Sequence, residues 1–124
     1  MPLSSPSPAP SVLVADDTAV ALSVVARRLQ ALGIGCLEAS SAQEASAVDP
    51  FAISCALLDL DLGDGSGVDV ALALRGRRPE LPIAFFSAGA APEELERARA
   101  LAHVFHKPGD LDQAVAWVQA QAIP

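Results

Sequence analysis

The chain of 124 residues has room for one domain of ordinary size, and its 52% hydrophobic content is enough for one buried core. Its formal net charge is −7, from 8 Lys and Arg residues against 15 Asp and Glu residues. This composition argues against a second domain among these residues and against direct binding of nucleic acid, because neutralising phosphates requires clustered cations.

The first ten residues alternate Ser, Pro and Ala, a composition that cannot bury apolar surface, and we expect residues 1–10 to be a disordered leader. The folded domain is expected over residues 11–124. The leader has neither the basic flank nor the apolar core of a signal peptide, and no stretch approaches the roughly 20 apolar residues that span a bilayer. We therefore expect a cytoplasmic protein that does not enter a membrane.

From residue 11 onward, short apolar runs alternate with helical patterns. The run 11–15 predicts a strand, and apolar residues at helical spacing from Thr18 to Leu32 predict a helix that Gly33 and Gly35 end. The pattern then repeats as pairs of strand and helix, over 36–39 and 42–48, 53–58 and 68–77, 83–86 and 92–101, and 104–106 and 111–122.

Five strand and helix units in succession predict an α/β fold with a doubly wound parallel sheet, because parallel strands need a crossover helix and the crossovers are right-handed. Helices then cover both faces, which requires strands that are hydrophobic throughout, as they are here. Cys36 and Cys55 lie in two of these strands and are interpreted as buried free thiols. In such sheets polar chemistry gathers at the carboxyl ends of the strands, so the residues that follow each apolar run are the site candidates.

Charged and polar residues follow four of the five predicted strands. Asp16 and Asp17 follow the first strand, Asp59 the third, Ser87 the fourth and Lys107 the fifth. Carboxylates that crowd together repel one another unless a divalent cation compensates, and Mg²⁺ is the natural choice because it prefers oxygen ligands. The alternative is that Asp16 and Asp17 only cap the helix that follows them.

Four motifs at these strand ends carry a resemblance to a known family. They are Val-Ala-Asp16-Asp17, Leu-Leu-Asp59-Leu-Asp61-Leu-Gly-Asp64-Gly-Ser-Gly67, Phe-Phe-Ser87-Ala and Lys107-Pro108. In this order and spacing, the chain resembles the receiver domains of response regulators from about residue 11 to residue 122. The resemblance implies a flavodoxin-like (βα)5 fold with strand order 2-1-3-4-5 and a cis peptide bond before Pro108.

The resemblance also implies roles for three strand-end residues. Asp59 would be the phospho-acceptor, Lys107 would contact the phosphoryl group, and Ser87 would occupy the switch position. The donor would be a phosphohistidine on a histidine kinase or a phosphotransfer protein. Attack of a carboxylate on phosphorus needs its negative charge partly neutralised, which Lys107 and Mg²⁺ would do.

For the metal, the resemblance implies four residues. Asp17 and Asp59 would bind Mg²⁺ directly, Asp16 would bind it through a water molecule, and Asp61 would supply its backbone carbonyl. The side chain of Asp61 is not assigned to the metal.

The chain departs from the family pattern in the fifth strand. Receivers usually carry an aromatic residue three positions before the strand-five lysine, where this chain has Val104. Phe105 follows it and should point to the opposite side of the sheet, because side chains alternate along a strand. Trp117 lies at the edge of the apolar stripe of the last helix. We interpret Val104 as part of a surface for a partner protein, and Trp117 either belongs to that surface or folds over its own domain.

The leading hypothesis is a receiver of two-component phosphorelay signalling, similar to the chemotaxis-type receivers without an output domain. It would act as a monomer or weak dimer, would assist its own phosphorylation and dephosphorylation without being an enzyme, and would switch a surface that binds a further protein. One alternative is a receiver fragment of a hybrid histidine kinase, and another is a receiver-like interaction module that is not phosphorylated. A third is an aspartyl-phosphate phosphatase, with Asp61 two residues past Asp59 as general acid or base.

Overall fold

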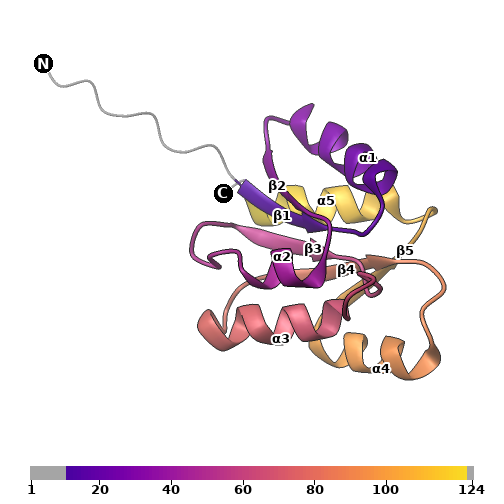
Figure 1. Ribbon diagram of the computed structural model, residues 1–124. Coiled ribbons are helices and arrows are strands. Elements are labelled where there is room, and N and C mark those ends of the chain that lie inside the picture. Colours follow the sequence, from indigo (N-terminus) through magenta and orange to yellow (C-terminus); the bar gives the residue numbers. More distant parts are fainter. Residues whose placement is uncertain (1–10, 123–124) are drawn as a thin grey trace, which may run out of the picture.

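The computed structural model describes residues 11–122, so the expected leader over residues 1–10 lies outside the described residues. The described residues form an α/β fold with a five-stranded parallel sheet in the order β2-β1-β3-β4-β5 (Figure 1). The elements are β1 (Ser11–Ala15), α1 (Ala19–Gln30), β2 (Gly35–Ala39), α2 (Ala42–Ser46), β3 (Cys55–Leu58), α3 (Gly67–Arg77), β4 (Ile83–Ser87), α4 (Pro92–Leu101), β5 (His103–His106) and α5 (Leu111–Ala122). The fold class and the strand order expected from the sequence are confirmed. Within residues 11–122, no helix combines the length and the hydropathy needed to cross a bilayer.

Two predicted boundaries between α2 and β3 differ from the structure by two residues each. The helix ends at Ser46 rather than at residue 48, and the strand begins at Cys55 rather than at residue 53. Pro50 disfavours a helical conformation of Asp49, which limits how far the helix can extend. The carbonyl of Ile53 accepts a hydrogen bond from the Arg78 guanidinium at 2.8 Å and takes no part in the sheet.

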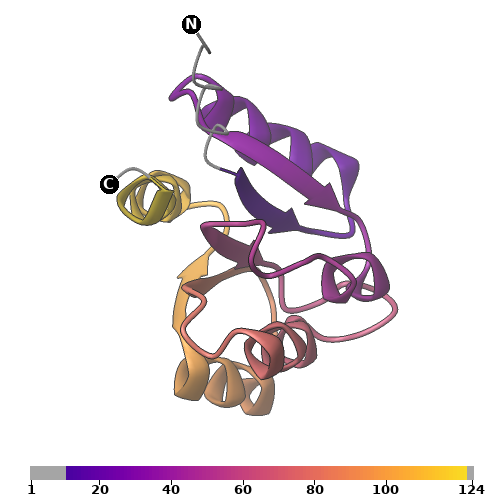
Figure 2. The ribbon, with the colours of Figure 1, turned by 90° about the vertical axis from the view of Figure 1, so that its left-hand side faces the viewer.

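Helices cover the sheet on both faces. One face packs against α2, α3 and α4, and the other packs against α1 and α5, as the two views in Figures 1 and 2 show. Successive side chains of each strand point to opposite faces. Phe85 of β4 therefore lies in the first of these layers and Phe86 in the second. Because all the strands are parallel, their carboxyl ends lie along one edge of the sheet.

The buried stripe of α1 is narrower than the apolar pattern of the sequence indicated. Leu22, Val25 and Leu29 are buried against the sheet. Val20 and Val24, which belong to the same apolar pattern, are 76% and 43% exposed. A helix turns about 100° per residue, so positions 20 and 24 lie outside the stripe that positions 22, 25 and 29 form.

The two cysteines cannot form a disulfide with each other. Val12 of β1 is the register partner of Cys36 on one side and of Cys55 on the other, so a whole strand separates the two thiols. Two strand spacings are about 9.6 Å, whereas disulfide-bonded Cα atoms lie within about 7 Å. Cys55 is buried as expected and Cys36 is half-buried. Burial raises their pKa values to about 12 and about 11, so both thiols stay protonated at neutral pH.

Candidate functional site

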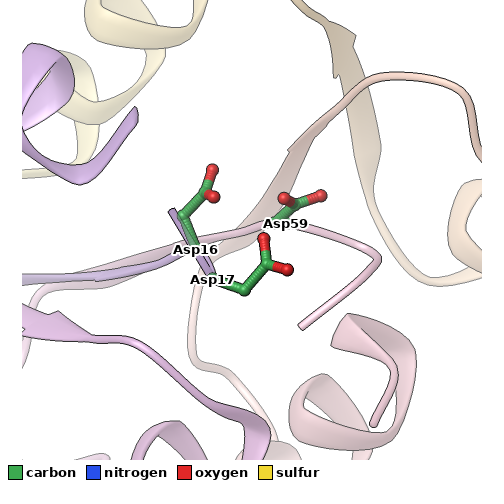
Figure 3. A group of neighbouring side chains, drawn as sticks. All are labelled: Asp16, Asp17 and Asp59. Atoms are coloured by element: carbon green, nitrogen blue, oxygen red, sulfur yellow. The ribbon is translucent and has the colours of Figure 1, made fainter. Parts of the chain in front are cut away.

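Three carboxylates meet at the carboxyl edge of the sheet. Asp16 and Asp17 follow β1 and Asp59 follows β3, which is the neighbour of β1. One carboxylate oxygen from each residue lies within 4.8 Å of the other two, and Figure 3 shows the Asp17 carboxylate directed toward Asp59. Asp16 and Asp59 are only 5% and 8% exposed, whereas Asp17 is open to solvent. The sheet thus brings together residues that are far apart in the sequence and forms one acidic cluster from them.

Each oxygen of the Asp59 carboxylate accepts a hydrogen bond from a different strand end. Ser87, the last residue of β4, donates through Oγ to Oδ1 at 2.7 Å. Lys107, just after β5, donates through Nζ to Oδ2 at 3.2 Å and also forms an ion pair with Asp16. The backbone N–H of Lys107 donates to the Ser87 carbonyl at 2.9 Å, which holds the two strand ends together. The peptide bond between Lys107 and Pro108 is cis, as expected.

The interpretation of Asp16 and Asp17 as simple helix caps is wrong, because Thr18 is the N-cap of α1. The Thr18 hydroxyl accepts a hydrogen bond from the N–H of Ala21 at 3.4 Å. Asp16 accepts hydrogen bonds from the N–H and the hydroxyl of Thr18, at 3.0 and 3.1 Å. Asp16 therefore supports the start of the helix and faces Lys107 as well.

The loop between β3 and α3 keeps the peptide of Asp61 beside Asp59. The N–H of Asp61 donates to Oδ1 of Asp59 at 3.3 Å, and the Asp61 carboxylate accepts the N–H of Gly63 at 3.0 Å. Asp61 also pairs with Ser66 in an isolated β-bridge. The Asp61 side chain is thus used within its own loop, which agrees with leaving it unassigned to the metal.

Comparison with known proteins connects this geometry to one family. A sequence profile of the response regulator receiver domain matches residues 12–119. The chain belongs to this family. Solved receiver proteins from Sinorhizobium medicae and Pseudomonas putida superpose on the chain with TM-scores of 0.81 and 0.81, at 25% and 29% sequence identity. The matches cover 93% of this chain and 95% of the first protein, and 92% of this chain and 98% of the second.

A curated relative is the acid tolerance regulatory protein ActR of Sinorhizobium medicae. It is 40% identical to the chain over 74 residues, which are 59% of the chain and 38% of the relative. The matched part therefore spans well under half of that relative's length.

Burial has opposite outcomes at the two charged groups at the centre of the receiver site, Asp59 and Lys107. It raises the pKa of the Asp59 carboxyl above its ordinary value of 3.8, although the hydrogen bond from Ser87 and the charge of Lys107 act in the opposite direction. Burial alone would lower the pKa of the Lys107 ammonium group, but its hydrogen bond to Asp16 and the charge of Asp59 outweigh burial and raise that pKa. The folded chain therefore disfavours the ionised form of Asp59, even with the positive charge of Lys107 beside it.

This pKa shift makes a prediction about stability in the absence of divalent cations. A carboxyl group whose pKa is higher in the folded chain binds its proton more tightly when folded. Its stabilising contribution is complete below the unfolded pKa, ordinarily 3.8, and is lost as the pH rises through the folded pKa. We therefore expect Asp59→Asn to gain thermal stability relative to the parent as the pH rises from about 4 to about 7 in EDTA.

The measurement is the melting temperature of both proteins across that pH range. The difference between them isolates Asp59, because every other titrating group is common to both. A difference that stays constant with pH would show that the folded protein does not raise the pKa of Asp59.

The expected partner surface is corrected at Val104. This residue is 9% exposed and packs in the layer of α2, α3 and α4, with Phe85 and Ala98. A side chain on this face of β5 is covered by α4, so Val104 offers little surface of its own. Phe105 lies in the opposite layer, as expected, and Trp117 is half-buried against that layer. Binding of a partner through Trp117 stays a prediction.

In the glycine-rich loop of this receiver domain, Gly63 has φ +79°, a left-handed turn conformation that favours glycine. A Cβ on Gly65 would lie 3.0 Å from the Cβ of Ala42, and one on Gly67 would overlap the carbonyl of Asp59. The last two glycines are therefore needed for close approach between segments. Gly63 thus serves the turn, and Gly65 and Gly67 serve the packing around it.

Two contacts of the loop were not predicted. Ser66 is the N-cap of α3, which its position just before the helix could have indicated, and its hydroxyl also donates to Glu94 of α4. Asp64 accepts hydrogen bonds from Ala42 and Gln43 of α2. No local pattern marks the contacts of Glu94 and Asp64, because they join segments that are far apart in the sequence.

Proposed function

We propose that this receiver domain accepts a phosphoryl group on Asp59 from a phosphohistidine of a histidine kinase or a phosphotransfer protein. The observation that carries the proposal is the pairing of Asp59, buried beside Asp16 and Asp17, with Ser87 on one oxygen and Lys107 on the other. A buried carboxylate with a hydroxyl and an ammonium group aimed at it is prepared for a transferred group that carries negative charge.

The same cluster fits a Mg²⁺ ion. Three carboxylates share the edge of the sheet with the single ammonium group of Lys107, so negative charge is in excess there. Oxygen ligands of this kind suit Mg²⁺, which commonly joins protein carboxylates to phosphate oxygens. In the proposal Asp17 and Asp59 hold the ion directly, Asp16 holds it through water, and Asp61 contributes its backbone carbonyl. When bound, Mg²⁺ supplies positive charge that offsets the charge of the phosphoryl oxygens.

The transfer itself needs little acid or base chemistry. An oxygen of Asp59 attacks phosphorus, the new O–P bond forms, and the bond from phosphorus to the imidazole nitrogen of the donor breaks. That nitrogen keeps the electron pair of the broken bond. Lys107, already 3.2 Å from Oδ2, then donates to an oxygen of the transferred group. The phosphoryl group stays on the chain, so the domain is an acceptor that assists its own modification and not an enzyme that turns over a substrate.

The switch in this proposal runs through Ser87. Its hydroxyl is bound to Oδ1 of Asp59 at 2.7 Å and would move to a phosphoryl oxygen after transfer. The loop that follows Ser87 borders a cleft of about 520 Å³, whose walls include Asp61, Ser66, Gly89 and Glu94. The loop therefore has space to shift, and α4, which begins directly after it, would shift with it. The changed surface would bind a further protein of a two-component pathway, which we place in the cytoplasm.

Acetyl phosphate tests the proposal without a kinase. We expect the intact mass of the purified chain to increase by one phosphoryl group in the presence of Mg²⁺, and not to increase in EDTA. Reduction of the adduct with borohydride converts an acyl phosphate to homoserine, and peptide mapping then locates it at Asp59. No adduct, with Mg²⁺-dependent thermal stabilisation intact, would contradict the proposal and favour a Mg²⁺-binding interaction module that is not phosphorylated.

A further inference from the structure

Asp64 joins two segments that meet only in the folded chain. It lies in the loop between β3 and α3, and its carboxylate accepts the backbone N–H of Ala42 at 2.6 Å and that of Gln43 at 3.1 Å. These two residues form the first turn of α2, which follows β2. One side chain therefore ties the loop that carries Asp61 to a helix that starts 22 residues earlier.

The first turn of α2 depends on this side chain. Ser41, the N-cap, accepts the N–H of Glu44 at 3.0 Å, and Asp64 takes the N–H groups of Ala42 and Gln43. A helix of five residues is too short to hold itself together without such partners. The two hydrogen bonds from Ala42 and Gln43 lower the pKa of the Asp64 carboxyl, so its ionised form is the one bound to the helix at neutral pH.

The loop also packs tightly against α2 and lies next to the acidic cluster. A Cβ on Gly65 would lie 3.0 Å from the Cβ of Ala42, which shows how closely the loop approaches the helix. On the other side, a Cβ on Gly63 would lie 3.8 Å from Oδ2 of Asp17. The segment from Asp61 to Gly65 therefore packs closely against α2 on one side and lies beside Asp17, one of the proposed Mg²⁺ ligands, on the other.

Hydrogen bonds within the loop connect Asp64 to Asp61. The N–H of Asp64 donates to the carbonyl of Leu62 at 2.9 Å, and the N–H of Leu62 donates to the carbonyl of Gly65 at 3.0 Å. The Asp61 carboxylate accepts the N–H of Gly63 at 3.0 Å. A turn closed in this way moves as one piece, so holding Asp64 against α2 also holds the backbone of Asp61.

We propose that Asp64 is a positioning residue for the Mg²⁺ site: by binding the first turn of α2, it holds the backbone of Asp61 opposite Asp17. This inference rests on the proposed function, because it concerns the same metal site. A loop that is already ordered loses less conformational freedom when the ion binds, so the ion binds more tightly. Asp64 does not touch the ion in this proposal and acts only through the loop.

The test is the Mg²⁺ affinity of the whole chain, measured by calorimetry. Residues that orient metal ligands change affinity by tenfold or more when they are removed, and we expect Asp64→Ala to raise the Mg²⁺ dissociation constant about tenfold. Asp64→Asn keeps one oxygen that can accept a hydrogen bond from an N–H group. Its Mg²⁺ dissociation constant should lie between those of Asp64→Ala and the parent. If only the lost charge mattered, Asp64→Asn and Asp64→Ala would weaken binding equally, and that result would overturn the proposal.

A matched control removes the same charge elsewhere. Asp49 accepts the N–H of Phe51 at 3.0 Å in the loop before β3, at the opposite edge of the sheet. Asp49→Ala should leave the Mg²⁺ dissociation constant unchanged. Equal affinities of Asp49→Ala and Asp64→Ala would also overturn the proposal.

Two further readouts separate positioning from general damage and from a failure of the proposed function. With acetyl phosphate, Asp64→Ala should need more Mg²⁺ for half-maximal phosphorylation yet reach a rate near that of the parent at saturating Mg²⁺. A lower maximal rate with unchanged Mg²⁺ dependence would contradict the positioning role.

Hydrogen exchange at the backbone N–H groups of Ala42 and Gln43 should be faster in Asp64→Ala than in the parent, even without Mg²⁺. A parent that binds no Mg²⁺ would overturn the metal site itself, whatever the exchange rates of the variants.

Discussion

Asp59→Asn is expected to abolish phosphorylation by acetyl phosphate in the presence of Mg²⁺. The amide that replaces the carboxylate has no negative charge, so it is a poor nucleophile toward phosphorus and a poor ligand for a hard cation. Its oxygen can still accept the hydrogen bond that Ser87 donates to Asp59 at 2.7 Å, so the packing of the edge is kept. Intact mass spectrometry after a fixed reaction time, with parent and variant side by side, measures the loss.

The control for this substitution is Asp112→Asn. Asp112 lies on α5 and pairs with Arg28 at 2.8 Å on the surface, so this change removes the same charge away from the site. It should be phosphorylated like the parent. An adduct on Asp59→Asn would place the acceptor elsewhere, and peptide mapping would then identify which carboxylate carries it.

Gly67→Ala is expected to destabilise the receiver domain by about 3 kcal/mol, because overpacking a rigid backbone contact costs energy of this order. Gly67 is the first residue of α3, and an added Cβ would overlap the carbonyl of Asp59 and crowd the backbone of Leu60. Both neighbours are backbone atoms next to the sheet, so they cannot move aside as a flexible side chain would. The substitution should also displace Asp59 and slow its phosphorylation.

Gly76→Ala is the matched control in the same helix. A Cβ there meets nothing within 4 Å. Alanine favours the helical conformation over glycine, so this variant should gain about 0.5 to 1 kcal/mol. Urea unfolding of the three proteins measures both changes. Equal stabilities of the two variants would contradict the close approach at Gly67.

The site could be predicted from the sequence as far as its chemistry follows the strand ends. Asp16, Asp59 and Lys107 each come directly after a predicted strand, and in a parallel sheet every such position lies at the same edge. That these residues meet could therefore be predicted without knowing how the helices pack on the sheet. The strand order came from the resemblance to receivers, because alternation of strands and helices indicates a parallel sheet and not the order of its strands.

The boundaries and the burial of side chains were predicted less well. Val20 and Val24 continue an apolar pattern that the sheet covers only in part, and Val104 was placed on a surface although α4 covers it. A periodic pattern gives the direction of a side chain relative to its own helix or strand. Whether another element lies in that direction depends on how the helices pack over the sheet.

The sequence by itself determined the α/β class, the elements and the gathering of acidic residues at one edge, because these follow from patterns within single segments and from the parallel direction of the strands. Only the tertiary structure decided that Asp64 binds the first turn of α2 and that Gly67 lies against the carbonyl of Asp59. These contacts join segments that are distant in the chain. Their distances are set when the helices pack on the sheet, so no local sequence pattern encodes them.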